Sequence, residues 1–92
     1  MEGRILTLHP EGKTGVNIAK DKYEAMKAAI LDQLAASGPQ SHADFRKAIN
    51  DRLEGTFDGS INWYLESVKL DLEARGVITH NRKSRLVSLV QA

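Results

Sequence analysis

The residues best suited to chemistry form a cluster of cations near the C-terminal end of the sequence. Arg82, Lys83 and Arg85 stand close together, and His80 precedes them. Lysine and arginine side chains gathered in this way can contact the phosphates of a nucleic acid, and such binding weakens as salt is added. The same cluster is also typical of a soluble hairpin turn, whose charges discourage pairing between sheet edges. Both interpretations stay open at this point.

Groups that could hold a metal or act in catalysis are few. The chain has no cysteine, which excludes disulfides, thiolate metal sites and cysteine nucleophiles. His9, His42 and His80 are far apart, and none has a histidine or carboxylate at the spacing of metal ligands. No local pattern joins a nucleophile to a base and an orienting acid. We therefore expect no metal, no cofactor and no enzymatic activity.

One segment has part of the pattern of a nucleotide-binding phosphate loop. Gly12, Lys13 and Thr14 match the end of that motif, but Thr7 occupies the position where the motif needs its first glycine. The motif also needs a parallel sheet that supplies a magnesium-binding acid, and the sequence predicts no such sheet. We therefore interpret Gly12 and Gly15 as hinges of an irregular arm.

The composition is that of an ordinary soluble domain. The sequence has 92 residues, of which 41% are hydrophobic and 27% charged, so it suits one domain with one hydrophobic core. Thirteen lysines and arginines against twelve acidic residues give a net charge of +1, which by itself does not indicate a nucleic-acid partner. Neither a signal peptide nor an apolar run of ~20 residues is present, so we expect a cytoplasmic protein that does not enter the membrane.

Two helices are predicted in the first half of the chain. Residues 18–36 carry apolar side chains at helical spacing, with Asn17 as the expected N-cap and Gly38 just beyond the end. Residues 42–54 form a second, shorter helix, for which Ser41 is the expected N-cap. A phosphate held at that helix start is the less favoured interpretation of the same serine.

A third helix and a hairpin are predicted in the second half. The helix covers residues 60–75, with Asp58 or Ser60 as its cap and Gly76 at its end. From residue 77 on, the apolar residues no longer follow the helical spacing.

Residues 77–80 and 85–90 are rich in β-branched and apolar side chains, and residues 81–84 between them are turn material, so they predict a hairpin. Near the N-terminus, residues 4–8 are a short strand candidate and residues 9–17 an irregular segment.

This order of elements resembles a helix-turn-helix with a wing. Residues 68–78 strengthen the resemblance, because they are similar to the junction at which the recognition helix of many winged-helix regulators ends and the wing begins. We therefore expect a mainly α fold with a small β-hairpin wing. It is a three-helix winged-helix-like domain over residues 19–92, preceded by an N-terminal arm over residues 1–18.

The whole chain also resembles a small uncharacterised bacterial family. The resemblance is carried by the blocks Leu8-His9-Pro10, Gly15-Val16-Asn17-Ile18, Trp63-Tyr64 and residues 69–76. It implies a winged-helix-like fold and brings no known activity.

The third predicted helix is apolar on two sides. Its inner stripe, expected to pack on the other two helices, consists of Ile61, Leu65, Val68 and Leu72. An outer stripe at the same spacing consists of Trp63, Ser67, Leu70 and Ala74. Because an exposed tryptophan-leucine patch would be unusual on a monomer, we expect the N-terminal arm or a second copy of the chain to cover it. The alternative is a tryptophan half-exposed at a helix edge.

The remaining stripe of this helix is polar and mixed in charge. It consists of Asn62, Glu66, Lys69 and Glu73, whose charges compensate one another at spacings of three and four residues. Against phosphates, two acids and one base would be net repulsive. This stripe argues against the ordinary mode of DNA recognition, in which polar and basic side chains read base edges.

The sequence supports two hypotheses about function. The first is a DNA-binding winged-helix protein, a small transcriptional regulator, in which the hairpin and the third helix contact double-stranded DNA. The residues expected at that interface are Arg82, Lys83, Arg85, Ser60, Asn62 and Lys69. The alternative is a protein-interaction or dimerisation module on the same scaffold, which docks a second copy or another protein through Trp63 and Leu70.

Overall fold

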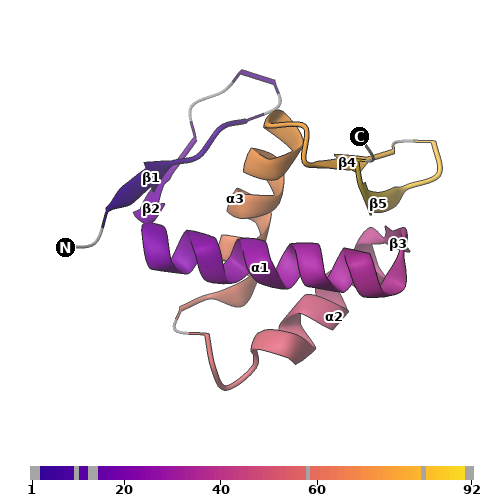
Figure 1. Ribbon diagram of the computed structural model, residues 1–92, viewed down its shortest axis with the longest axis horizontal. Coiled ribbons are helices and arrows are strands. Elements are labelled where there is room, and N and C mark those ends of the chain that lie inside the picture. Colours follow the sequence, from indigo (N-terminus) through magenta and orange to yellow (C-terminus); the bar gives the residue numbers. More distant parts are fainter. Residues whose placement is uncertain (1–2, 10, 13–14, 58, 82, 91–92) are drawn as a thin grey trace.

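Three helices and five short strands make up the part of the chain that the computed structural model describes, namely residues 3–9, 11–12, 15–57, 59–81 and 83–90. In chain order they are β1 (Arg4–Leu6), β2 (Asn17–Ala19), α1 (Lys20–Ser37), β3 (Gln40–Ser41), α2 (His42–Leu53), α3 (Ile61–Ala74), β4 (Ile78–His80) and β5 (Leu86–Leu89). Helix α1 packs against both α2 and α3; β1 and β2 lie near its start, and β3 to β5 lie near its end (Figure 1). The expected mainly α fold with small antiparallel strands is confirmed.

The start of α1 differs from the prediction. Asn17 does not cap this helix, because it lies in β2, where its side-chain oxygen accepts a hydrogen bond from Arg4 Nε at 3.0 Å. Ala19 stands at the N-cap and makes no side-chain hydrogen bond there. The helix ends as predicted: Gly38 has a φ of +73°, and its N–H donates to the carbonyl of Leu34 at 2.8 Å. Glycine adopts a positive φ without steric cost, so the chain can leave the helix at this point.

Helices α2 and α3 begin at serines that the sequence predicts as caps. Ser41 Oγ accepts a hydrogen bond from the Asp44 N–H at 3.2 Å, and Ser60 Oγ accepts one from the Trp63 N–H at 3.3 Å. Each serine satisfies a backbone donor that has no partner within the helix. Asp58, the other candidate cap, lies outside the described residues.

The end of α3 also follows the prediction. Gly76 has a φ of +76°, its N–H donates to Glu73 at 3.1 Å, and the Val77 N–H donates to Leu72 at 2.9 Å. This pair of bonds is the Schellman arrangement, which satisfies the last carbonyls of a helix and needs a residue that tolerates a positive φ. It directs the chain from α3 straight into β4.

The second half of the chain completes a three-stranded antiparallel sheet in the order β3-β5-β4. β4 and β5 form the predicted hairpin, with Ile78 opposite Leu89. β3 is absent from the predicted elements, because it contains only Gln40 and Ser41, which pair with Val87 and Leu86. The sheet therefore holds the start of α2 beside the hairpin.

The N-terminal segment is more regular than predicted. β1 pairs antiparallel with β2, so residue 17 lies in a strand rather than in an irregular segment, and residues 18–19, predicted to begin the first helix, belong to the same strand. Beyond the strands, the Thr7 N–H donates to the Val16 carbonyl at 2.8 Å, and the Val16 N–H donates to Thr7 Oγ1 at 2.9 Å. A Cβ on Gly15 would lie 1.8 Å from the Thr7 carbonyl oxygen, so only glycine permits this close approach.

The hydrophobic core lies between the three helices and the three-stranded sheet. Its largest fully buried apolar side chains are Met26, Ile30, Leu34, Phe45, Ile49, Leu65, Val68, Leu72, Ile78 and Val87. The predicted inner stripe of the third helix is confirmed, since Leu65, Val68 and Leu72 are buried and Ile61 packs half-buried beside them. Within the described residues, no helix is long and apolar enough to span a bilayer.

Candidate functional site

An open groove of about 720 Å³ lies between the start of α2, the outer side of α3 and the β4-β5 hairpin. The residues that line it are Ser41, His42, Ala43, Glu66, Lys69, Leu70, Glu73, His80 and Arg85. Of the residues predicted to act at an interface, the groove brings together Lys69, Leu70 and Arg85. It also includes His42 and His80, neither of which is among the residues predicted at the interface.

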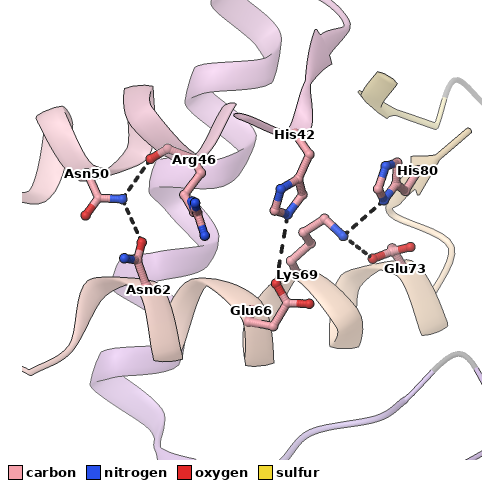
Figure 2. A network of polar contacts seen from close by, with 8 residues as sticks. All are labelled: His42, Arg46, Asn50, Asn62, Glu66, Lys69, Glu73 and His80. Atoms are coloured by element: carbon pink, nitrogen blue, oxygen red, sulfur yellow. Dashed lines mark hydrogen bonds and ion pairs between the residues drawn. The ribbon is translucent and has the colours of Figure 1, made fainter. Parts of the chain in front are cut away.

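Lys69 is buried at the floor of the groove. Its side chain is only 3% exposed, and its Nζ donates to Glu73 Oε2 at 2.8 Å (Figure 2). The same Nζ lies 3.4 Å from His80 Nδ1. A buried cation needs such partners, because burial removes its hydration. The charge predicted to meet DNA at this position is therefore compensated by Glu73.

His42 and His80 stack on each other above Lys69. Their ring centroids are 5.7 Å apart and their planes are inclined by 16°. His42 Nε2 lies 3.9 Å from Glu66 Oε2 on α3 (Figure 2). Burial, and then the positive charge of Lys69, lower the pKa of His42 below its ordinary value. The stacked pair links the first residue of α2 to the last residue of β4.

A second polar contact joins α2 to the start of α3. Asn50 Nδ2 donates to the Arg46 carbonyl and to Asn62 Oδ1, both at 2.8 Å. The amide oxygen of Asn62, a predicted DNA contact, is therefore used within the chain. The Arg46 side chain is exposed and lies between this contact and the His42–Glu66 pair (Figure 2). Ser60, another predicted contact, caps α3.

The turn of the hairpin presents its cations to solvent. Lys83 and Arg85 are both exposed, and Arg82 lies outside the described residues. The Asn81 side-chain oxygen accepts hydrogen bonds from the N–H groups of Lys83 and Ser84 at 2.9 and 3.1 Å, a common role of asparagine in turns. Arg85 has a φ of +60°, which is uncommon for a residue other than glycine, and its side chain lines the groove.

Trp63 and Leu70 do not share one covered surface. Trp63 is 48% exposed, with its ring edge against Tyr64 at a centroid distance of 4.9 Å. Leu70 is half-buried in the groove. The expectation that the arm covers Trp63 is wrong for the described residues, because the arm reaches α3 at Asp71, roughly two turns beyond Trp63.

The most extensive buried polar contact was not predicted as a site. Asp71 is fully buried and accepts hydrogen bonds from the Tyr23 hydroxyl, from Arg75 Nε at 2.9 Å and from the Leu8 N–H at 2.8 Å. It thereby connects the N-terminal segment, α1 and α3. Burial and the adjacent Asp71 carboxylate raise the pKa of Tyr23 to about 12.

Two signals in the sequence could have found these buried charges. Asp71 and Arg75, and likewise Lys69 and Glu73, are four residues apart with opposite charges, and Asp71 falls beside the inner stripe of the helix. All four residues belong to one of the blocks that carry the family resemblance. That block therefore contains two ion pairs within α3 and the end of this helix.

Comparison with known proteins adds a family and no activity. Among the described residues, no three histidine or acidic side chains are placed to hold a metal ion. No curated protein and no solved structure matches the chain. A family model described as a family of unknown function matches residues 4–88. Because this match spans most of the chain, the protein belongs to the DUF6958 family.

Proposed function

We propose that this chain is a winged-helix domain that binds double-stranded DNA, as a small transcriptional regulator does. The support from the fold is the order of the elements: α2 and α3 follow each other across a short connection, and a hairpin follows α3. The packing of α3 against β4 supports the same assignment, because it sets the hairpin beside α3 as a wing stands beside a recognition helix. Fold analogy alone does not identify the surface that would contact DNA.

The observation that carries the proposal is the pair of exposed cations at the hairpin turn, Lys83 and Arg85, beside the groove of α3. Free cations at a wing can contact the phosphate backbone of a duplex. Arg46 adds a further exposed cation on the α2 side. The affinity of binding through these groups would come from contacts with the phosphate backbone.

Base reading by α3 contributes little in this proposal. Lys69 is compensated by Glu73, the oxygen of Asn62 accepts from Asn50, and Glu66 is exposed on the same side of the helix. An exposed carboxylate repels phosphates, and occupied side chains do not read base edges. The protein therefore binds duplexes with weak sequence preference and strong salt dependence.

A fluorescence anisotropy titration with a labelled random-sequence duplex at low salt tests this proposal. We expect binding that weakens steeply with salt, and a slope of log K against log salt that falls by about 0.9 for each phosphate contact removed. Replacing Lys83 and Arg85 by glutamine should weaken binding strongly. The control is the double variant Arg4→Gln, Lys20→Gln, which loses the same charge at the β1-β2 end. No binding by the unmodified protein, or equal losses in both variants, would refute the proposal.

A second candidate function rests on Trp63. A tryptophan that is 48% exposed on the outer side of a helix can anchor a protein interface, because a large aromatic side chain gains much from burial. We propose self-association through Trp63 as the alternative to DNA binding. Sedimentation at several concentrations should show a dimer that Trp63→Ala abolishes. A monomer at every concentration, with indole emission unchanged by concentration, would eliminate this candidate.

A further inference from the structure

We propose that His42 and His80 form a proton switch that controls the affinity of the groove for the phosphate backbone of DNA. The inference rests on the proposed function and adds its regulation. The two imidazoles come from α2 and β4, and their ring centroids lie 5.7 Å apart in the groove that Arg85 also lines.

The fixed charges around the imidazoles balance at neutral pH. From α3, the groove receives the carboxylates of Glu66 and Glu73 and the ammonium of Lys69. From the hairpin turn it receives the guanidinium of Arg85. Two negative and two positive charges thus line the groove. Because they cancel, a groove with neutral histidines attracts a polyanion only weakly. The exposed Arg46 on α2 stands outside the lining, at the border of the groove.

Protonation of the two histidines changes this balance by two positive charges. Histidine is the side chain that ordinarily changes charge between pH 5 and 8, whereas glutamate keeps its charge over most of that range. The groove would therefore pass from a balanced site to a cationic one on mild acidification. A phosphate bound there would offset the repulsion between the stacked cations and between them and Lys69.

Lys69 lies next to the stacked imidazoles in the groove. His80 Nδ1 lies 3.4 Å from the Lys69 ammonium, which can only donate, so this nitrogen is the acceptor. The lowered pKa of His42 keeps its ring neutral near pH 7. Glu66, at 3.9 Å from His42 Nε2, becomes an ion-pair partner once that ring is protonated. Proton uptake and phosphate binding then promote each other, because linkage between two ligands is reciprocal.

Duplex affinity measured at constant ionic strength between about pH 7.5 and pH 5.5 tests the switch, since histidine titrates across this interval. The affinity of the unmodified protein should rise about tenfold on acidification, a typical size for coupled sites. The double variant His42→Gln, His80→Gln should lose most of this rise. His9→Gln is the matched control and should keep it, because His9 lies in the N-terminal segment, where its ring accepts a hydrogen bond from the Glu11 N–H.

The possible results distinguish a failure of the pH switch from a failure of the proposed DNA binding. Binding with the same affinity at both pH values, or a pH dependence that survives in the double variant, would overturn the switch and leave DNA binding standing. No binding at any pH would remove the proposed function. Proton NMR of the unmodified protein needs no variant: the His42 ring should titrate at higher pH with duplex bound, and an unchanged titration would also overturn the switch.

Discussion

Among the residues that the structure describes, two charged side chains are buried, Lys69 and Asp71, and both lie in α3. Asp71 accepts three hydrogen bonds, and Lys69 is paired with Glu73 beneath the histidines. In a sequence, a charged residue between leucines is interpreted as surface, because the partners that offset its desolvation belong to other elements. The exposed cations Lys83 and Arg85 and the four-residue spacing of Lys69 and Glu73 are visible in the sequence, whereas the burial of Lys69 against His80 is not.

Asp71 should contribute far more to stability than an exposed carboxylate in the same type of pair. Asp71→Ala leaves the Tyr23 hydroxyl and the Leu8 N–H without an acceptor, and a buried hydrogen-bonding group left without its partner costs about 1 to 3 kcal/mol. The control is Asp51→Ala, which removes the exposed ion pair with Lys47 and should cost about 0 to 1 kcal/mol. Urea denaturation measures both values, and equal losses would contradict the role given to Asp71.

Tyr23 should make the fold sensitive to alkaline pH. Its pKa is about 12 in the folded protein and about 10 in the unfolded chain, so the folded state holds this proton more tightly. Its contribution to the free energy of unfolding is complete below pH 10 and is lost as pH rises towards 12. Urea denaturation at increasing pH should show this loss, and Tyr23→Phe should reduce the slope. A slope unchanged in that variant would exclude Tyr23 as the cause.

At the scale of elements, the sequence indicates structure wherever the signal is local. Capping serines and terminal glycines delimit α2 and α3, and apolar spacing predicts all three helices. The hairpin is likewise visible, because its strands adjoin in sequence. β3 escapes prediction, because two residues have no periodicity and its partner lies far along the chain. β2 escapes for a related reason: Asn17 has the side chain of a good cap, but pairing with β1 takes it into a strand.

The attachment of the N-terminal segment should depend on Gly15. Gly15→Ala would drive a Cβ into the Thr7 carbonyl, so the segment must move and the Leu8 N–H must leave Asp71. Hydrogen exchange of the Leu8 amide should accelerate markedly in this variant. Gly3→Ala is the control, because its Cβ would meet only the Lys20 side chain at 3.9 Å. Protection of Leu8 that persists in Gly15→Ala would show that the segment does not depend on this close approach.

At the scale of the whole molecule, the groove exists because the sheet order brings distant residues together. β3 leads directly into α2 and pairs with β5, while β4 carries His80 on the other side of β5. This arrangement sets His42 against His80 and places Arg85 at the same opening. No sequence pattern joins residues from three elements in this way. A mainly α fold with small antiparallel strands was therefore predictable from local signals, but the composition of the groove was not.

The proposed function places two different surfaces at the two ends of α1. The β1-β2 end holds the segment tied to Asp71, and the other end holds the groove and the hairpin cations (Figure 1). DNA is expected at the second end alone, since Lys83 and Arg85 lie there.

Amide chemical-shift mapping with a random-sequence duplex tests this central claim most directly. At low salt and mildly acidic pH, the shifts should concentrate on residues 41–43 and 83–85, should fade as salt is added, and should leave the amides of β1 and β2 unchanged. An unchanged spectrum at excess duplex, or shifts confined to the β1-β2 end, would contradict DNA binding through the hairpin and groove.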